Sequence, residues 1–481
     1  MNATRIGDHL WELPIGTVPG MRVPGRVFAS KELFDKAVAD RAVEQVANVA
    51  TLPGVVEASY AMPDIHWGYG FPIGGVAATD AAGDGVISPG GVGFDIGCGV
   101  RLMRTNLEWD GETGPEIRRL VDALGRIVPR GVGGKGRLPV TGKDLITVLE
   151  RGVMLPIERG MGWDDDAEMC EDAGTLPDAD VAALSDRALE RGAKQLGSLG
   201  AGNHFLEVQV VEDVHDRRSA EIMGLFKGGV CVMIHSGSRG LGHQACTEHL
   251  RTVDRLMPKL GIDVPDRQLA CVPIQHEAAE SYLGAMNAAG NFARANRQVL
   301  TDAARAGFER VFRRSARDLG MELIYDISHN LAKIEEFEIA GRPRQLCVHR
   351  KGATRALGPG HHAVPDRYRA IGQPVIVPGS MGSPSYVLTG TNESADLAFS
   401  STCHGAGRAM SRKKAKKQMT GAELKAKLES QGIHVAKSQL GLLSEEAPYA
   451  YKDASEVVKT CEAAGLSRIV ARLRPVGVIK G

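Results

Sequence analysis

Ser400-Ser401-Thr402-Cys403-His404-Gly405-Ala406-Gly407-Arg408 is the stretch around which the whole chain can be interpreted. A histidine lies between small hydroxyl residues and a Gly-Ala-Gly turn, and a basic run, 408–417, follows. Glycines let a backbone approach a ligand closely and direct its N–H groups at an anion. A helix beginning in the basic run would strengthen a phosphate site, although such a run is by default a solvated helix face. We therefore interpret His404 as a reactive group held beside phosphate.

Length and charge limit the possible architectures and partners. A chain of 481 residues with 43% hydrophobic content can bury a large core, and its length alone suggests two or three domains. The 58 basic residues balance the 58 acidic ones, so attraction of nucleic acid by overall charge is excluded and any basic footprint is local. Because the notable motifs come from both ends and the middle, we expect one large domain.

The cysteines and the apolar runs indicate the cellular compartment in which we expect the protein. The eight cysteines are scattered and no pair is spaced Cys-x-x-Cys. The N-terminus lacks the apolar run of a signal peptide, and no apolar stretch approaches the roughly 18 residues of a membrane helix. We expect free thiols in a reducing, cytoplasmic setting and no membrane association.

Hydrophobic periodicity predicts helices and strands in irregular order. A glycine-rich strand region spans 54–107, and the acidic cluster Asp164-Asp165-Asp166 is expected on a solvated face or turn. Helices are predicted at 31–50, 178–196, 284–319, 423–431 and 454–464. Strands are predicted at 204–214, 229–235, 323–327, 345–349, 374–377, 385–388 and 467–481. This mixture indicates an α+β fold rather than a regular doubly wound sheet.

Five side chains are candidate metal ligands because of their surroundings. Asp95 and Cys98 form a D-x-x-C pair in a glycine-rich turn, and His204 follows Gly-Ala-Gly-Asn. His235 and His329 end apolar, strand-like segments, where sites are usually built. Together they could hold two divalent ions if one ligand bridges, and the donor types suit manganese, zinc or iron equally.

Other interpretations of these residues remain open. A strand-end histidine is more often a hydrogen-bonded core residue than a ligand, and Cys98 alone would be a small buried hydrophobe. The dispersed spacing excludes a zinc finger or ribbon. A cysteine-phosphatase loop is excluded because four residues, not five, separate Cys403 from Arg408.

Seven blocks in the same order resemble the RtcB family of GTP-dependent RNA ligases. The resemblance extends from before residue 60 to Lys480. It implies a single large α+β domain over 1–481, in which mixed sheets flanked by helices enclose a deep two-metal active-site cleft. The blocks are 64–75, 88–101, 202–207, 235–240, 328–330, 378–382 and 400–408.

The resemblance also implies roles for individual residues. Two manganese ions would share Cys98, with Asp95 and His204 on one ion and His235 and His329 on the other. His404 matches the histidine that becomes guanylylated, and Asp64 the carboxylate that orients it. Arg239 is similar to a contact of the RNA phosphate, and we add Arg408 and Arg412 of the basic run as RNA contacts. The positions that match GTP or GMP binding are Asn203, His204, Phe205, Leu206, Glu207, His329, Asn330, Pro378, Gly379, Ser380, Met381, Ser385, His404, Gly405, Ala406, Gly407, Tyr451 and Lys480.

The implied reaction is ligation of RNA ends. His404 would attack the α-phosphate of GTP, and backbone donors of 405–407 would offset phosphoryl charge. GMP would pass to an RNA 3′-phosphate, and a 5′-hydroxyl would then expel it. A 2′,3′-cyclic phosphate end would first be hydrolysed at the same metals.

Two other functions compete with RNA ligation as interpretations of these residues. A metal-dependent phosphodiesterase would open cyclic phosphates without a nucleotide, and a non-enzymatic RNA-binding factor would use the basic run alone. An aromatic content of 5% argues against the second. Transfer-RNA splicing and RNA repair are both open as physiological roles, as is activation by archease, and we expect a monomer.

Overall fold

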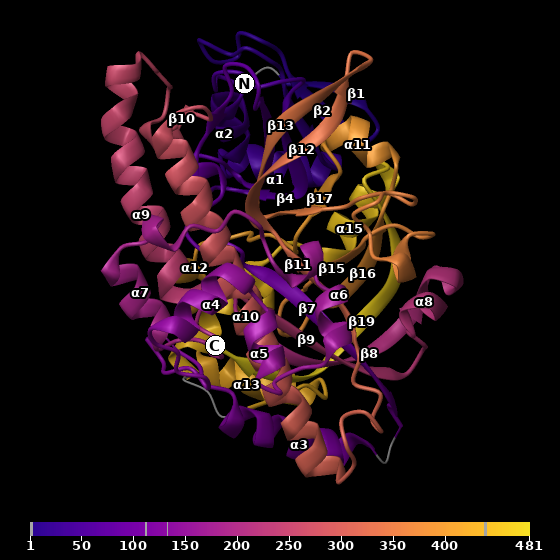
Figure 1. Cartoon of the computed structure of the whole chain (residues 1–481). Helices are drawn as coiled ribbons and strands as arrows, with labels where there is room; N and C mark the ends of the chain where they lie inside the picture. The colour runs from indigo at the N-terminus through magenta and orange to yellow at the C-terminus, as the bar shows by residue number, and fades with distance from the viewer. Residues whose placement is uncertain (1–2, 111–112, 132, 437–439) are drawn as a thin grey trace.

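Two large β-sheets organise the chain (Figure 1). The structure is a computed structural model that describes residues 3–110, 113–131, 133–436 and 440–481. The N-terminal sheet has the order β1 (Thr4–Gly7), β2 (Leu10–Leu13), β3 (Gly25–Phe28), β4 (Ser59–His66), β5 (Ile73–Asp80), β13 (Arg342–Lys351), β12 (Asn330–Ile339). The central sheet has the order β11 (Leu323–Ser328), β7 (Gly99–Glu108), β9 (Gly229–Ser236), β8 (Phe205–Val214), β19 (Ser467–Lys480), β16 (Ser385–Gly390), β15 (Pro374–Val377).

Smaller pairings complete the strands. β18 (His434–Val435) pairs with β19, β10 (Val272–Pro273) with β6 (Val86–Ile87), and β14 (Ala353–Arg355) with β17 (Ser401–Cys403). The pairing of β14 with β17 holds the segment just before His404. The last strand, β19, lies inside the central sheet between β8 and β16, so both ends of the chain contribute to the two main sheets.

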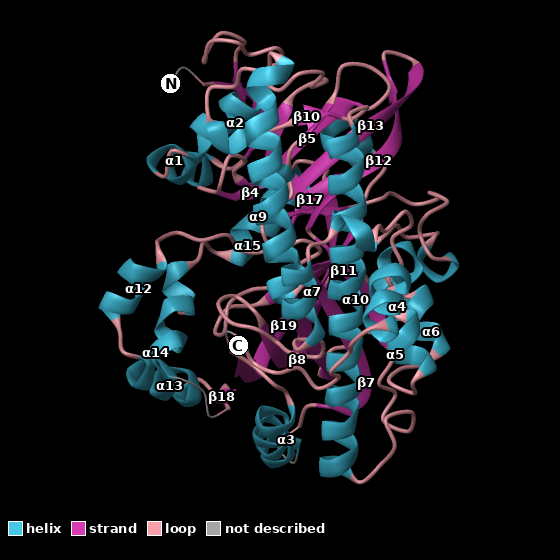
Figure 2. Cartoon of the chain, turned by 60° about the vertical axis from the view of Figure 1, so that its left-hand side comes forward, coloured by secondary structure: helices cyan, strands magenta, loops and turns pink. Residues whose placement is uncertain are grey.

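Helices cover the sheets, and the α+β class is confirmed. In Figure 2, the long helix α10 runs beside α9 along the body of the protein, and α12, α13 and α14 lie together on one side. The helices are α1 (Lys31–Ala39), α2 (Ala42–Val49), α3 (Thr113–Ile127), α4 (Lys143–Arg151), α5 (Met154–Glu158), α6 (Asp164–Glu168), α7 (Asp186–Ala193), α8 (Arg217–Met223), α9 (Arg239–Leu256), α10 (Glu277–Phe312), α11 (Glu393–Ala398), α12 (Arg412–Gln418), α13 (Gly421–Ser430), α14 (Leu440–Leu443) and α15 (Ala454–Ala463). None of those described has the length and apolar character to cross a bilayer.

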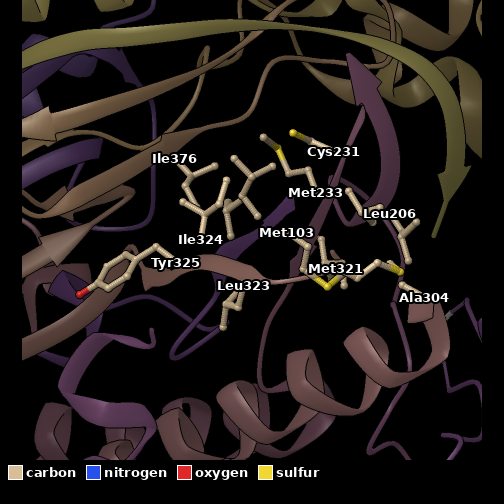
Figure 3. Close-up of a cluster of buried hydrophobic side chains, with 14 of the residues drawn as sticks. Met103, Leu206, Cys231, Met233, Ala304, Met321, Leu323, Ile324, Tyr325 and Ile376 are labelled. Atoms are coloured by element: carbon tan, nitrogen blue, oxygen red, sulfur yellow. The ribbon is translucent and has the colours of Figure 1, made fainter. Parts of the chain in front are cut away.

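The core under the central sheet is apolar and tightly filled. Figure 3 shows Met103, Met233 and Leu206 from neighbouring strands together with Ala304 of α10. Leu206 and Met233 are fully buried. Burying an aliphatic side chain of this size contributes about 1.5–3 kcal/mol. This packing fixes α10 against the sheet whose strand ends carry the site.

Most predicted elements are present, with shifted boundaries. The strands predicted at 374–377 and 467–481 are confirmed as β15 and β19. The helix predicted at 284–319 begins earlier, because the His276 side chain caps α10 by accepting from the Ala278 N–H, and it ends at Arg313 in a left-handed conformation. The predicted 178–196 helix is a 3-10 turn followed by α7, which begins after Ser185.

Two predictions from the sequence were wrong in part, and one strand was missed. The 31–50 segment is two helices, because Arg41 has a φ of 61° and breaks the helical path. The strand β12, which pairs with β13 along its whole length, was not predicted. Asp166 is not solvated: it is 1% exposed, and its carboxylate binds Arg305 through two oxygens at 2.6 and 2.7 Å.

Candidate active site

Antiparallel pairing in the central sheet brings strand starts beside strand ends. β9 runs antiparallel to both β7 and β8, and β11 runs antiparallel to β7. His235 near the end of β9 pairs with Phe205 at the start of β8, while Ser328 at the end of β11 pairs with Gly99 at the start of β7. The register therefore gathers, at one edge of the sheet, His235 and the flanking residues Cys98, His204 and His329.

Cys98 is the centre of this cluster. Its Sγ lies 3.4 Å from Nε2 of His204 and 3.3 Å from Nε2 of His235. Nε2 of His204 is also 2.9 Å from an Asp95 carboxylate oxygen. The ring of His329 packs edge-on against His235, with centroids 5.1 Å apart. The structure thus brings all five predicted ligands together.

The donor set fits divalent metal ions. Ligand atoms of Cys98, His204 and His235 lie within 4.8 Å of one another, and all three residues are buried. Nδ1 of His204 is buried without a hydrogen-bond partner. Burial lowers the pKa of His235 and His329, which favours the neutral imidazole that a metal ion requires. Burial and the Asp95 charge raise the pKa of the Cys98 thiol, a cost that a bound cation would remove.

His404 is oriented by Asp64. Nδ1 of His404 lies 2.6 Å from Oδ2 of Asp64, a fully buried residue. Although burial opposes the carboxylate's charge, the His404 ring and backbone N–H hold the pKa of Asp64 below its usual value. Since Nδ1 faces the carboxylate, Nε2 is the nitrogen left to act as a nucleophile. The structure places these two predicted residues in direct contact.

The glycine turn after His404 contacts Asp64. The N–H groups of His404 and Gly405 both donate to Oδ2 of Asp64, at 3.1 and 3.3 Å. The turn was expected to offer backbone N–H groups to a phosphate, and here the Gly405 N–H is directed at the Asp64 carboxylate. At Gly407, which has a φ of 73°, an added Cβ would lie 2.1 Å from the Asp64 carbonyl oxygen. A side chain at Gly407 would push the turn away from Asp64.

A cavity of about 450 Å³ opens over His404, Cys98, His235 and His329. This size is in the range of small-molecule sites. Its walls include fourteen further residues predicted from the sequence: Asp95, Asn203, Phe205, Asn330, Pro378, Gly379, Ser380, Met381, Gly405, Ala406, Arg408, Arg412, Tyr451 and Lys480. Gly407 also lines it, so the whole 404–407 turn faces the cavity.

Four positions predicted to bind the nucleotide do not line the cavity: His204, Leu206, Glu207 and Ser385. Leu206 is a core side chain with no exposure. Glu207 is buried, and its Oε2 accepts from Nε2 of Gln209 at 2.7 Å while Oε1 has no partner. Burial raises the pKa of Glu207 to about 7. The same Gln209 amide donates to Ser385 Oγ at 2.9 Å, and that oxygen accepts from the Gly379 N–H at 3.0 Å.

The predicted RNA-contacting arginines lie in two places. Arg239 donates to Ser198 Oγ at 3.2 Å, and burial lowers its pKa. Arg408 and Arg412 line the cavity and bind the two oxygens of Glu446 at 3.0 and 2.7 Å. Helix α12 begins only at Arg412, so the predicted helix does not follow the glycine turn directly.

Several residues of the site were missed from the sequence. Glu446 joins Arg408, Arg412 and the Tyr451 hydroxyl, and no motif pointed to it. Lys452 donates from Nζ to the carbonyls of Pro63 and Ile65, on either side of Asp64. Its own N–H donates to Gly407 at 2.9 Å, which ties the two halves of the dyad together. Burial lowers the pKa of Lys452 to about 8.

Two further missed residues, Lys351 and Trp67, line the cavity. Lys351 at the end of β13 reaches the carbonyls of Tyr69 and Phe71, and burial lowers its pKa to about 7. Trp67 projects from the loop after β4. Trp67 could have been found from the sequence, because it belongs to the 64–75 block. No motif in the sequence pointed to Lys351.

Comparison with known proteins matches almost the whole chain to a single family. A family model described as tRNA-splicing ligase RtcB matches residues 45–481. The chain is 51% identical over 477 residues to "tRNA-splicing ligase RtcB" of Archaeoglobus fulgidus, covering 99% of this chain and 98% of the relative. It is 52% identical over 477 residues to the protein of that name in Thermococcus kodakarensis, with the same coverage. It is 54% identical over 439 residues to "RNA-splicing ligase RtcB" of Mycobacterium tuberculosis, covering 91% of this chain and 100% of the relative. The chain therefore belongs to the RtcB family.

Proposed function

We propose that the protein is a GTP- and manganese-dependent ligase that joins an RNA 3′-phosphate or 2′,3′-cyclic phosphate end to a 5′-hydroxyl end. The observation that carries this proposal is the 2.6 Å contact between Asp64 and His404, whose ring lines the same cavity as Cys98, His235 and His329. The printed names of the relatives support RNA ligation as the reaction class.

The first step would place guanylate on His404. The lone pair of Nε2 attacks the α-phosphorus of GTP, the N–P bond forms, and pyrophosphate leaves. Asp64 stabilises the positive charge that develops on the ring and keeps the proton on Nδ1. Arg408 and Arg412 line the same cavity and offer guanidinium groups to the departing phosphates.

Selection of guanine is assigned to Glu207. A carboxylate can accept both from the ring N–H and from the amino group of guanine. The unpartnered Oε1 supports this assignment, because a buried acceptor without a donor is costly and a ligand donor would satisfy it. Lys480, whose Nζ lies 5.5 Å from the centroid of the Phe205 ring, would help to hold the nucleotide.

Asp95, Cys98, His204, His235 and His329 would hold two manganese ions, with Cys98 shared. The ions would supply positive charge that stabilises phosphoryl oxygens and the attacking and leaving groups. The thiol and the imidazoles are buried, and the low dielectric around buried groups strengthens an ionic interaction with them.

The later steps transfer the guanylate. An oxygen of the RNA 3′-phosphate attacks the phosphorus on His404, breaking the N–P bond and leaving the 3′ end as an anhydride with GMP. The 5′-hydroxyl then attacks the 3′-phosphate, forming the phosphodiester and releasing GMP. A cyclic phosphate end would require hydrolysis beforehand. Arg239 is proposed to contact the RNA phosphate.

The test is covalent labelling. The protein is incubated with manganese and with GTP radiolabelled at the α-phosphate, denatured, and separated on a gel, while intact mass is measured in parallel. Label and the mass of one GMP are expected on the unaltered protein and not on His404→Ala. Label retained by His404→Ala would contradict the assignment. Opening of cyclic phosphates without GTP and without joining would instead indicate a phosphodiesterase.

A further inference from the structure

The loop between β4 and β5 exposes two aromatic side chains at the mouth of the His404 cavity. Trp67 is 45% exposed and Tyr69 is 37% exposed, and both line the cavity. Among the large hydrophobic side chains exposed in the described residues, the third aromatic is Phe226. Exposed aromatic rings grouped at a cavity mouth lose burial energy, so they indicate a surface that meets a ligand.

Hydrogen bonds with the residue that follows α1, with α2 and with a distant 3-10 helix fix the backbone that carries these rings. The Trp67 N–H donates to Asp40 Oδ2 at 2.6 Å. The next residue, Gly68, donates to Gln45 Oε1 at 2.9 Å and accepts from Nε2 of the same side chain at 2.8 Å. The Gly70 N–H donates to Gln268 Oε1 at 3.0 Å. A loop held in this way presents its rings without an ordering cost on binding.

Tyr69 and Phe94 form a ridge between two hollows. Tyr69 packs edge-on against Phe94, with centroids 5.2 Å apart. Both line the His404 cavity on one side and a hollow of about 260 Å³ on the other, whose wall includes Arg251 and Arg267. Arg267 is paired with Asp254 at 2.7 Å. A strand leaving the cavity would cross the ridge and reach these guanidinium groups.

We propose that Trp67 and Tyr69 form a stacking platform for the unpaired bases of the RNA nucleotides next to the end that is joined. This inference rests on the proposed RNA ligase function. Flat aromatic rings beside cationic side chains are the combination that binds unpaired bases, whereas two rings are too small a patch for a stable protein partner. Because every base has a π-face, the platform would tolerate any sequence near the end, as a ligase of varied ends requires.

The experiment compares bases with abasic sites. Single-stranded RNAs bearing a 3′-phosphate or a 5′-hydroxyl are made with normal bases and with an abasic nucleotide at the first or second position from that end. Binding to the full-length protein with manganese and without GTP is measured by fluorescence anisotropy. Loss of the base is expected to weaken binding about ten-fold in at least one strand, which identifies the end that crosses the ridge.

Variants of Trp67 and Tyr69 show whether the rings stack on bases or only shape the mouth of the cavity. Trp67→Ala and Tyr69→Ala are each expected to weaken the base-bearing RNA about ten-fold and to leave the abasic RNA unchanged. Trp67→Phe should recover most of the affinity. Phe226→Ala is the matched control, since it removes an exposed aromatic ring outside the cavity. Equal loss for base-bearing and abasic RNA, or no loss for either, would overturn the platform.

Covalent guanylate formation on the unaltered protein is measured separately. Its absence would overturn the proposed function while leaving a base-dependent loss of RNA binding intact. Its presence together with unchanged RNA binding in both alanine variants would overturn the platform alone.

Discussion

Asp64 Oδ2 and His404 Nδ1 lie 2.6 Å apart although 340 positions separate them in the chain. Three further groups hold this contact: the N–H groups of His404 and Gly405, and the Lys452 ammonium on the carbonyls beside Asp64. The dyad is thus preorganised, because the carboxylate cannot turn away from the ring without breaking several bonds.

Asp64→Asn is expected to slow guanylylation about 10³-fold or more while His404 remains in place. The neutral amide does not stabilise the imidazolium and does not fix the nucleophilic tautomer, which is the orienting role of an aspartate beside a catalytic histidine. Labelling by GTP is followed over time under single-turnover conditions. Asp35→Asn, an exposed residue paired with Lys31, is the control and should label normally. Equal rates for both variants would remove Asp64 from the reaction.

Cys98→Ala is expected to lose bound manganese. Removing the sulfur takes away the atom that lies 3.3–3.4 Å from both imidazoles and leaves fewer anionic donors. Metal content of purified, manganese-loaded protein is measured by elemental analysis. Cys347→Ala serves as control, because Cys347 is also fully buried but lies in a hydrophobic cluster. Unchanged metal content in Cys98→Ala would exclude a bridging role.

Asp166→Ala is expected to destabilise the fold by about 3–5 kcal/mol, because it leaves the Arg305 guanidinium buried without its carboxylate. Arg305 also stacks on Trp163, with Cζ 3.6 Å from the ring centroid, and so cannot easily turn to solvent. Chemical denaturation followed by circular dichroism measures the loss. Asp165→Ala, next in the chain and exposed, should change the free energy of unfolding by less than about 0.5 kcal/mol. Similar losses for the two variants would contradict the buried ion pair.

Asp326 is expected to give a stability contribution that depends on pH. Burial opposes its charge, but Arg297 and Arg101 bind it at 2.6 Å each and hold its pKa below the usual value. With the folded pKa below the unfolded value of about 3.9, the stabilisation is complete above that pH and is lost as the pH falls through the folded pKa.

The measurement compares Asp326→Asn with the unaltered protein by thermal unfolding from pH 7 to pH 3. At pH 7 the variant should unfold at a markedly lower temperature than the unaltered protein. This difference in unfolding temperature should become smaller below about pH 4. Asp366→Asn, at an exposed residue, should show no such trend. A difference in unfolding temperature that stays constant from pH 7 to pH 3 would show that the charge of Asp326 does not stabilise the fold.

The strands were predicted best where they are apolar and buried on both faces. β15 and β9 are fully buried, and their runs of valine and isoleucine are visible without any structure. β12 was missed because its outer half alternates exposed and half-buried residues, and its identity as a strand depends on pairing with β13. The break at Arg41 was missed because an arginine gives no signal of a left-handed conformation.

Residue types and their local spacing were enough to recognise the motif blocks. These blocks predicted the family, the α+β class, and Cys98, His404 and the residues expected beside them. Which atoms meet depends on the three-dimensional arrangement of the chain. The register of antiparallel strands brings Cys98, His204 and His235 together, and the buried Asp64 accepts hydrogen bonds from the N–H groups of His404 and Gly405. Glu446 and Asp166 likewise gained their roles from partners far along the chain, since charge pairing inside a protein depends on distance and burial, which a sequence does not contain.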